Sequence, residues 1–186
     1  GITSIGKYAF DGCNNLSSIS IPTTVNAIGD WAFRGCSSLS GVSLPTGLRS
    51  IGYAAFRECS ALQSIVIPEN VSAIGDWAFS KCSSLTSAKL PAKITSIATA
   101  LFYEDAALKT VNLPSGLTSI GAGAFQYCSA LNEIFLPESL TLIEGGRYTQ
   151  SGGGNPFQGC GSEFSATVIR GSYSHDWCEE TSTPYE

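Results

Sequence analysis

The residue types in this chain best suited to chemistry are its seven cysteines and its single histidine. Six of the cysteines occupy one position of a recurring phrase: Cys13, Cys36, Cys59, Cys82, Cys128 and Cys160. The chain contains no C-x-x-C pair and no cluster of cysteine with histidine, the spacings typical of zinc sites. We therefore predict that the chain binds no metal and no cofactor.

Regularly spaced cysteines could instead form disulfides or pack as small apolar side chains. In stacked repeats, equivalent side chains point in parallel, so their Cβ atoms stay about 5 Å apart, beyond the usual distance of about 3.5–4.5 Å in a disulfide. We expect the repeat cysteines to be buried and reduced. The sequence leaves open whether Cys160 and Cys178 form a disulfide.

Hydrolytic catalysis lacks the residues it needs. His175 falls near the end of the chain, and no serine lies in a G-x-S-x-G motif. We expect His175 to be a solvated surface residue. Glu179 and Glu180 are adjacent, so a helix would point them in different directions. The glycine-rich segment at 144–154 lacks the Gly-Lys-Ser/Thr of a phosphate-binding loop. The sequence thus predicts a protein that is not an enzyme.

The cysteines belong to a repeat whose clearest copy runs from Ile28 to Cys36. Its first isoleucine recurs every 23 residues, at Ile5, Ile28, Ile51, Ile74, Ile97, Ile120 and Ile143. A fixed period of this length indicates an array of stacked units, each in contact only with its neighbours.

Within one unit, residues 16–22 predict a strand, because Ile19 and Ile21 alternate with serines and would face the core. Gly29 allows the backbone to bend, and residues 30–33 predict a short helical turn. Stacked units then place equivalent strands side by side in a parallel sheet.

Two copies depart from the pattern. The fifth has Ala98 for glycine, Leu101 for alanine and Asp105 for cysteine. The seventh is interrupted by nine inserted residues within 144–154. Beyond it, residues 171–180 predict a short amphipathic helix with Ser172 as its N-cap.

These residues together resemble the BspA-like, treponemal-type leucine-rich repeat, with the pattern L-x-x-I-x-L-P-x-x-L-x-x-I-G-x-x-A-F-x-x-C. The resemblance implies a right-handed, β-rich α/β solenoid. One strand per 23-residue coil would form a parallel sheet on one face, with short helical turns on the other. We expect an array of about seven coils over residues 1–169 and a C-terminal cap over 170–186. We also expect further coils upstream.

Composition and charge exclude several partners. Ten Lys and Arg residues against fifteen Asp and Glu give a net charge of −5, which argues against nucleic acid and anionic membranes. No apolar run reaches the roughly 18 residues of a membrane span. We expect a monomer with no membrane insertion in this chain.

Three regions could contact a ligand. The first is the outward face of the predicted sheet, with Val66, Lys89, Asn112, Glu133 and Phe135. The second is the insertion and its edge, with Arg147, Tyr148, Gln150 and Asn155. The third is an aromatic platform for sugar rings formed by Trp31 and Trp77.

The family resemblance implies a function that no single residue shows. It implies a secreted or cell-surface bacterial adhesion module that binds host or microbial macromolecules through the sheet face and the inserted loop. A passive stalk that displays other domains is the alternative, and glycan binding through surface aromatics is a second alternative.

Overall fold

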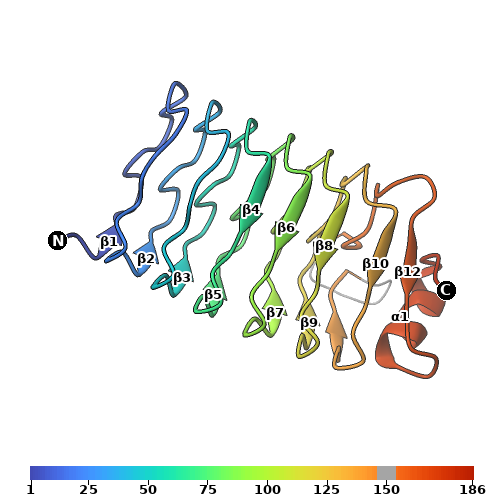
Figure 1. Ribbon diagram of the computed structural model, residues 1–186. Coiled ribbons are helices and arrows are strands. Elements are labelled where there is room, and N and C mark those ends of the chain that lie inside the picture. Colours follow the sequence, from blue (N-terminus) through green and yellow to red (C-terminus); the bar gives the residue numbers. More distant parts are fainter. Residues whose placement is uncertain (146–153) are drawn as a thin grey trace.

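The computed structural model describes residues 1–145 and 154–186. These residues form a solenoid of stacked coils, with the N-terminus at one end and the only helix of the described residues at the other (Figure 1). Every strand pairing among the described residues is parallel and joins adjacent coils. The predicted solenoid class is confirmed.

Each complete coil contributes residues to two ladders rather than to one. The longer strands are β4 (Ser64–Val66), β6 (Ser87–Lys89), β8 (Thr110–Asn112), β10 (Glu133–Phe135) and β12 (Ser165–Thr167). The shorter strands are β1 (Ser4–Ile5), β2 (Ala27–Ile28), β3 (Ser50–Ile51), β5 (Ala73–Ile74), β7 (Ser96–Ile97), β9 (Ser119–Ile120) and β11 (Leu142–Ile143). The sequence predicted only the longer ladder, since a two-residue strand shows no alternation.

The core is built from identical side chains stacked along the solenoid axis. The rings of Phe10, Phe33, Phe56, Phe79, Phe102, Phe125, Phe157 and Phe164 form one column, with successive centroids 5.1 to 5.9 Å apart. Stacked aromatic pairs contribute roughly 0.5–1.5 kcal/mol each beyond the burial of their surface. The column therefore ties neighbouring coils together along the axis.

The repeat cysteines form a second column beside the rings. The thiol of Cys59 donates to the carbonyl of Phe33 at 3.2 Å, and the thiols of Cys36, Cys82, Cys128 and Cys160 likewise donate to phenylalanine carbonyls of the preceding coil. Burial raises the pKa of Cys36 to about 11 and also raises that of Cys59, so both thiols stay protonated and able to donate. The seven cysteines are free thiols, Cys160 and Cys178 included.

The coil corners differ from the predicted helical turns. Every second amide along a corner donates to the next coil, as Trp31 does to Tyr53 at 2.8 Å and Phe33 to Ala55 at 2.7 Å. These amides are not available for bonds to the fourth residue back, so no α-helix forms. Trp31 instead has φ 53°, a left-handed conformation shared by the equivalent Tyr8 and Trp77.

The repeat glycine allows adjacent coils to touch backbone to backbone. A Cβ atom at Gly75 would lie 2.5 Å from the amide nitrogen of Tyr53, and one at Gly52 would lie 2.6 Å from that of Asp30. With glycine there, the amide of Gly75 donates to Ile51 at 2.9 Å and that of Gly52 to Ile28 at 2.8 Å. Glycine at this position is therefore a packing requirement.

The fifth coil carries Ala98 at the glycine position, and the shorter ladder is interrupted there. β5 and β7 are not paired, although β1, β2, β3 and β5 form one sheet and β7, β9 and β11 another. Within the described residues, neither Thr95 nor Ala98 makes the amide bond to the fourth coil that its equivalents make elsewhere. The extra methyl group of Ala98 explains this gap, because it occupies the space that glycine leaves open.

Glu144 also replaces the repeat glycine but keeps its ladder bond, donating from its amide to Ile120 at 2.9 Å. Its neighbour Gly145 has φ 86°, a left-handed conformation that favours glycine. The Glu144 carboxylate then accepts from the amide of Ala122 at 3.1 Å.

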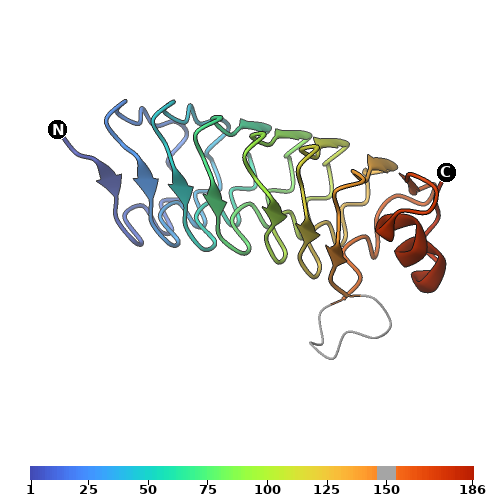
Figure 2. The ribbon, with the colours of Figure 1, turned by 90° about the horizontal axis from the view of Figure 1, so that it is seen from below.

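The last coil is covered by α1 (Tyr173–Thr181), as Figure 2 shows from below. Ser172 caps the helix by accepting from the amide of His175 at 3.2 Å, which confirms the predicted N-cap. Trp177 is buried, and its ring lies edge-on to Phe157 with centroids 5.9 Å apart. The helix thus closes the phenylalanine column.

Because the repeat glycine packs directly against the backbone of the preceding coil, we predict that Gly75→Ala destabilises the chain by about 1–3 kcal/mol, the usual cost of overpacking. Urea unfolding measures this loss. Gly116→Ala is the matched control, since a Cβ there would meet nothing within 4 Å. Equal stability of the two variants would contradict the requirement for close coil contact.

Candidate binding surface

The longer ladder presents one open face, on which most side chains are small or polar. Two large apolar side chains break this pattern: Val66 is 63% exposed on β4 and Phe135 is 55% exposed on β10. The middle residue of each of these strands is buried, as the predicted alternation requires. Exposed apolar groups on an otherwise polar face are candidate contact points.

The sheet opens between β8 and β10, and a groove of about 450 Å³ lies there. We call it the β8/β10 groove. It is lined by residues 109–113 on one side, by β10 on the other, and by Thr167 at its end. The amide of Lys109 donates to Thr86 at 3.0 Å, and the amide of Ser165 donates to Asn132 at 2.9 Å. Among the described residues, Asn132 makes no equivalent bond to Lys109, so the two coils separate here.

Three polar side chains along the β8/β10 groove make no polar contact with other described residues. Within the described residues, no ion pair or hydrogen bond involves the side chains of Lys109, Asn112 or Glu133. One ammonium group, one amide and one carboxylate thus border the exposed ring of Phe135. Such a mixture of an aromatic ring and polar groups is typical of protein-binding surfaces.

A second depression of about 520 Å³ lies on the other side of Phe135. Its apolar walls are Phe135, Pro137 and Ile169, and its polar rim includes Ser115 and Glu138. Ile169 is itself exposed. Phe135 therefore stands between two hollows, where a partner could surround its ring.

Three of the predicted contact residues lie nearer the middle of the array. Val66, Lys89 and Asn112 line a smaller depression of about 180 Å³ across β4, β6 and β8. The Lys89 ammonium lies 4.0 Å from the Glu69 carboxylate, a long and exposed pair. Asn112 borders both this depression and the β8/β10 groove, so it links the two parts of the face.

Of the predicted contact residues in and beside the insertion, Asn155 alone is among the described residues. Arg147, Tyr148 and Gln150 lie outside the described residues. Asn155 is described, and its side chain is engaged: it accepts from the amide of Phe157 at 2.8 Å and donates to Thr183 at 3.3 Å. Asn155 therefore holds the turn against the cap.

Trp31 and Trp77 belong to two separate stacks. Trp31 lies between Tyr8 and Tyr53, with both ring centroids 4.9 Å away. Trp77 lies between Tyr103 at 5.3 Å and the Arg57 guanidinium at 5.4 Å. The two indoles do not meet, and protein groups lie against both of them.

Asp105 lies inside the protein rather than on its surface. One of its carboxylate oxygens accepts from the amide of Cys82 at 2.8 Å, and the other is buried with no partner among the described residues. Burial raises the pKa of the Asp105 carboxyl well above its usual value. The residue is a substitution within the cysteine column and contributes nothing to the binding face.

The fold defines a leucine-rich repeat solenoid with a parallel sheet face. The chain belongs to the family described as the BspA type leucine rich repeat region, whose pattern matches residues 3–132 and 55–152 with six copies. A search of curated proteins found no match.

Three bacterial proteins of known structure are similar to this chain. A leucine rich cell surface protein from Faecalibacterium prausnitzii is 35% identical with a TM-score of 0.72, over 80% of this chain and 40% of that protein. The T. pallidum leucine rich repeat protein is 30% identical with a TM-score of 0.66, over 75% of this chain and 72% of that one. A leucine-rich repeat protein from Bacteroides ovatus is 26% identical with a TM-score of 0.54, over 92% and 54%.

This chain therefore spans less than half of the F. prausnitzii protein. The family and its neighbours indicate a protein-interaction or structural role and a fold that generally lacks enzymatic activity. No helix in the described part of the chain is long and apolar enough to cross a membrane.

The buried carboxyl of Asp105 should make the stability of the folded chain depend on pH. Its raised pKa in the folded state favours the protonated form, so its contribution to stability is greatest in acid and is lost as the pH rises through that pKa. Asp105→Asn stays uncharged throughout. We expect the variant to be more stable than the parent chain at pH 7 and to lose that advantage towards pH 4, as measured by urea unfolding. A difference independent of pH would contradict the buried carboxyl.

Proposed function

We propose that this chain is a non-enzymatic binding module of an extracellular or cell-surface bacterial protein, and that it binds a protein partner on the sheet face around Phe135. The observation that carries the proposal is the exposed Phe135 ring between two hollows, on a face otherwise made of small and polar side chains. A protein partner on a host or microbial surface is the occupant that suits this role.

Several features support a protein rather than a small molecule. The hollows around Phe135 are open to solvent, whereas small-molecule sites enclose most of their ligand. An aromatic side chain at the centre with polar groups around it is the usual composition of a binding hot spot. The F. prausnitzii protein, similar over most of this chain, is described as a cell surface protein.

Two other functions remain as alternatives. A stalk that displays other domains would need the array and no partner on its face. A glycan-binding surface would use the aromatic side chains at the corners, among them Trp31 and Trp77. The inserted residues Arg147, Tyr148 and Gln150 would extend the contact surface in either binding function.

The test is a selection of peptide ligands from a phage-displayed library against the immobilised chain, with a glycan array in parallel. We expect peptides whose affinity falls about 30-fold or more in Phe135→Ser, equivalent to about 2 kcal/mol at a hot spot. The matched control is Ile2→Ser, which removes an equally exposed apolar side chain, 59% exposed, at the other end of the array. Binding of the control variant should equal that of the parent chain.

Each other outcome favours a different function. Peptides that bind the two variants equally would remove the Phe135 face from the proposal. A signal confined to the glycan array and lost in Trp31→Ala or Trp77→Ala would favour the sugar platform. The absence of any ligand in both assays would favour the stalk.

A further inference from the structure

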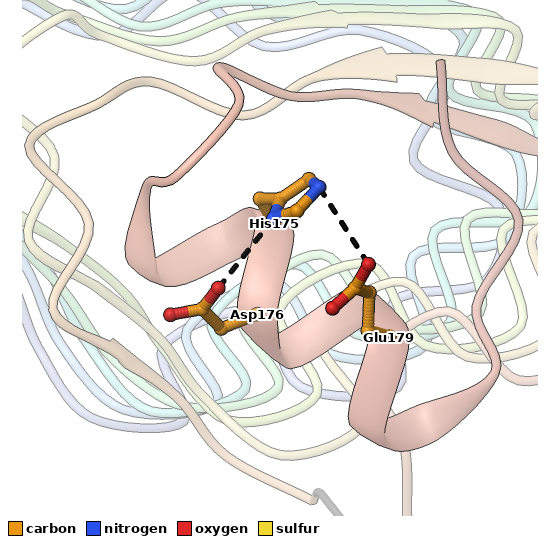
Figure 3. Close-up of side chains that lie close together, drawn as sticks. All are labelled: His175, Asp176 and Glu179. Atoms are coloured by element: carbon orange, nitrogen blue, oxygen red, sulfur yellow. Dashed lines mark hydrogen bonds and ion pairs between the residues drawn. The ribbon is translucent and has the colours of Figure 1, made fainter.

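The cap helix brings the single histidine of the chain between two carboxylates. His175, Asp176 and Glu179 each offer an atom, and these atoms lie within 4.8 Å of one another (Figure 3). The Nδ1 atom of His175 is 3.4 Å from Asp176 Oδ1, and its Nε2 atom is 3.8 Å from Glu179 Oε1. The two carboxylates therefore face opposite nitrogens of one imidazole.

This division gives the two carboxylates different tasks. His175 and Glu179 are four residues apart on a helix, the spacing that places two side chains on one face. Bonds of about 2.0–2.2 Å to a tetrahedral zinc ion separate two ligand atoms by roughly 3.4 Å, close to the 3.8 Å between Nε2 and Oε1. Asp176 meanwhile accepts from Nδ1–H, an arrangement that fixes the tautomer and leaves Nε2 free for a metal.

Tyr185 holds both ligand side chains in place. Its ring lies edge-on to the His175 imidazole with centroids 5.2 Å apart, and its hydroxyl donates to Glu179 Oε1 at 3.1 Å. The His175 side chain is only 17% exposed, so its orientation is restricted by packing. From the sequence we expected His175 to be a solvated surface residue. That prediction is wrong, because the chain after α1 returns and covers most of the ring.

The surroundings favour a cation and leave it room. A depression of about 340 Å³ lies beside these residues, lined by His175, Glu179, Tyr185, Glu186 and Arg170, with Val168. Asp176, Glu179 and Glu186 outnumber the single Arg170, so the local charge is negative. Water can fill the remaining coordination positions.

We propose that His175 and Glu179 form a surface site for a divalent transition-metal ion of the zinc class, with Asp176 as a positioning residue. An imidazole nitrogen paired with a carboxylate oxygen suits Zn²⁺, Ni²⁺ and Cu²⁺ better than Mg²⁺ or Ca²⁺, which prefer oxygen ligands alone. The site is independent of the Phe135 face. The His-x-x-x-Glu spacing on the predicted helix is the sequence signal for this site, which cysteine–histidine spacings do not reveal.

The experiment titrates ZnCl₂ into the full chain and follows the imidazole signals by NMR, which are unambiguous because the chain has one histidine. A Cys13→Ser background removes the exposed thiol as a competing ligand. We expect saturable shifts with one ion per chain, loss of binding in His175→Gln, and at least tenfold weaker binding in Glu179→Gln. Asp176→Asn should weaken binding by roughly 10–100-fold, the usual effect of losing a carboxylate that orients a ligand.

Glu180→Gln is the matched control, since it removes the same charge from the adjacent residue without touching the cluster. Its affinity for Zn²⁺ should stay within about twofold of the parent. Equal weakening in Glu179→Gln and Glu180→Gln would mean that the ion only responds to acidic charge, and would overturn the proposal. Unchanged imidazole signals at saturating ZnCl₂ would overturn it as well.

Discussion

The rest of this structure depends on how closely each coil packs against the next. The spacing is set where the repeat glycine lies against the preceding backbone, at Gly29, Gly52, Gly75 and Gly121. Contact there aligns the shorter ladder, places the rings of Phe10, Phe33 and Phe56 at successive centroid distances of 5.1 Å and lets thiols such as that of Cys59 reach a carbonyl. Most of the core is therefore one contact repeated every 23 residues.

The binding face can be understood as a local failure of that contact. At Ala98 the fifth coil stands away from the fourth along the shorter ladder, and at the β8/β10 groove it stands away from the sixth along the longer ladder. The fifth coil keeps its other two pairings, β7 with β9 and β8 with β6. A tilt of the fifth coil would separate it from the fourth coil along the shorter ladder and from the sixth coil along the longer ladder. If one tilt of the fifth coil causes both openings, the methyl group of Ala98 contributes to the groove next to Phe135.

Much of the fold could be predicted from sequence because identical residues repeat and their environments repeat with them. The period, the alternation of β4 to β10, the burial of most repeat cysteines and the Ser172 cap all followed from local patterns. The corners could not be predicted, because tryptophan and tyrosine at positive φ carry no recognisable signal. Phe135 and Glu133 were predicted as contact residues, and both line the β8/β10 groove. Lys109 and Ile169 were not predicted, because their place beside the hollows depends on how neighbouring coils pack.

Amide hydrogen exchange in the parent chain and in Ala98→Gly tests the tilt most directly. In the parent chain we expect the amides of Thr95 and Asn132 to exchange quickly, while the ladder amides of Thr118 and Lys109 are protected. In Ala98→Gly both Thr95 and Asn132 should become protected together, because the fifth coil returns to the register of its neighbours. Protection of Thr95 with continued rapid exchange at Asn132 would show that the two openings are unrelated, and would contradict the account.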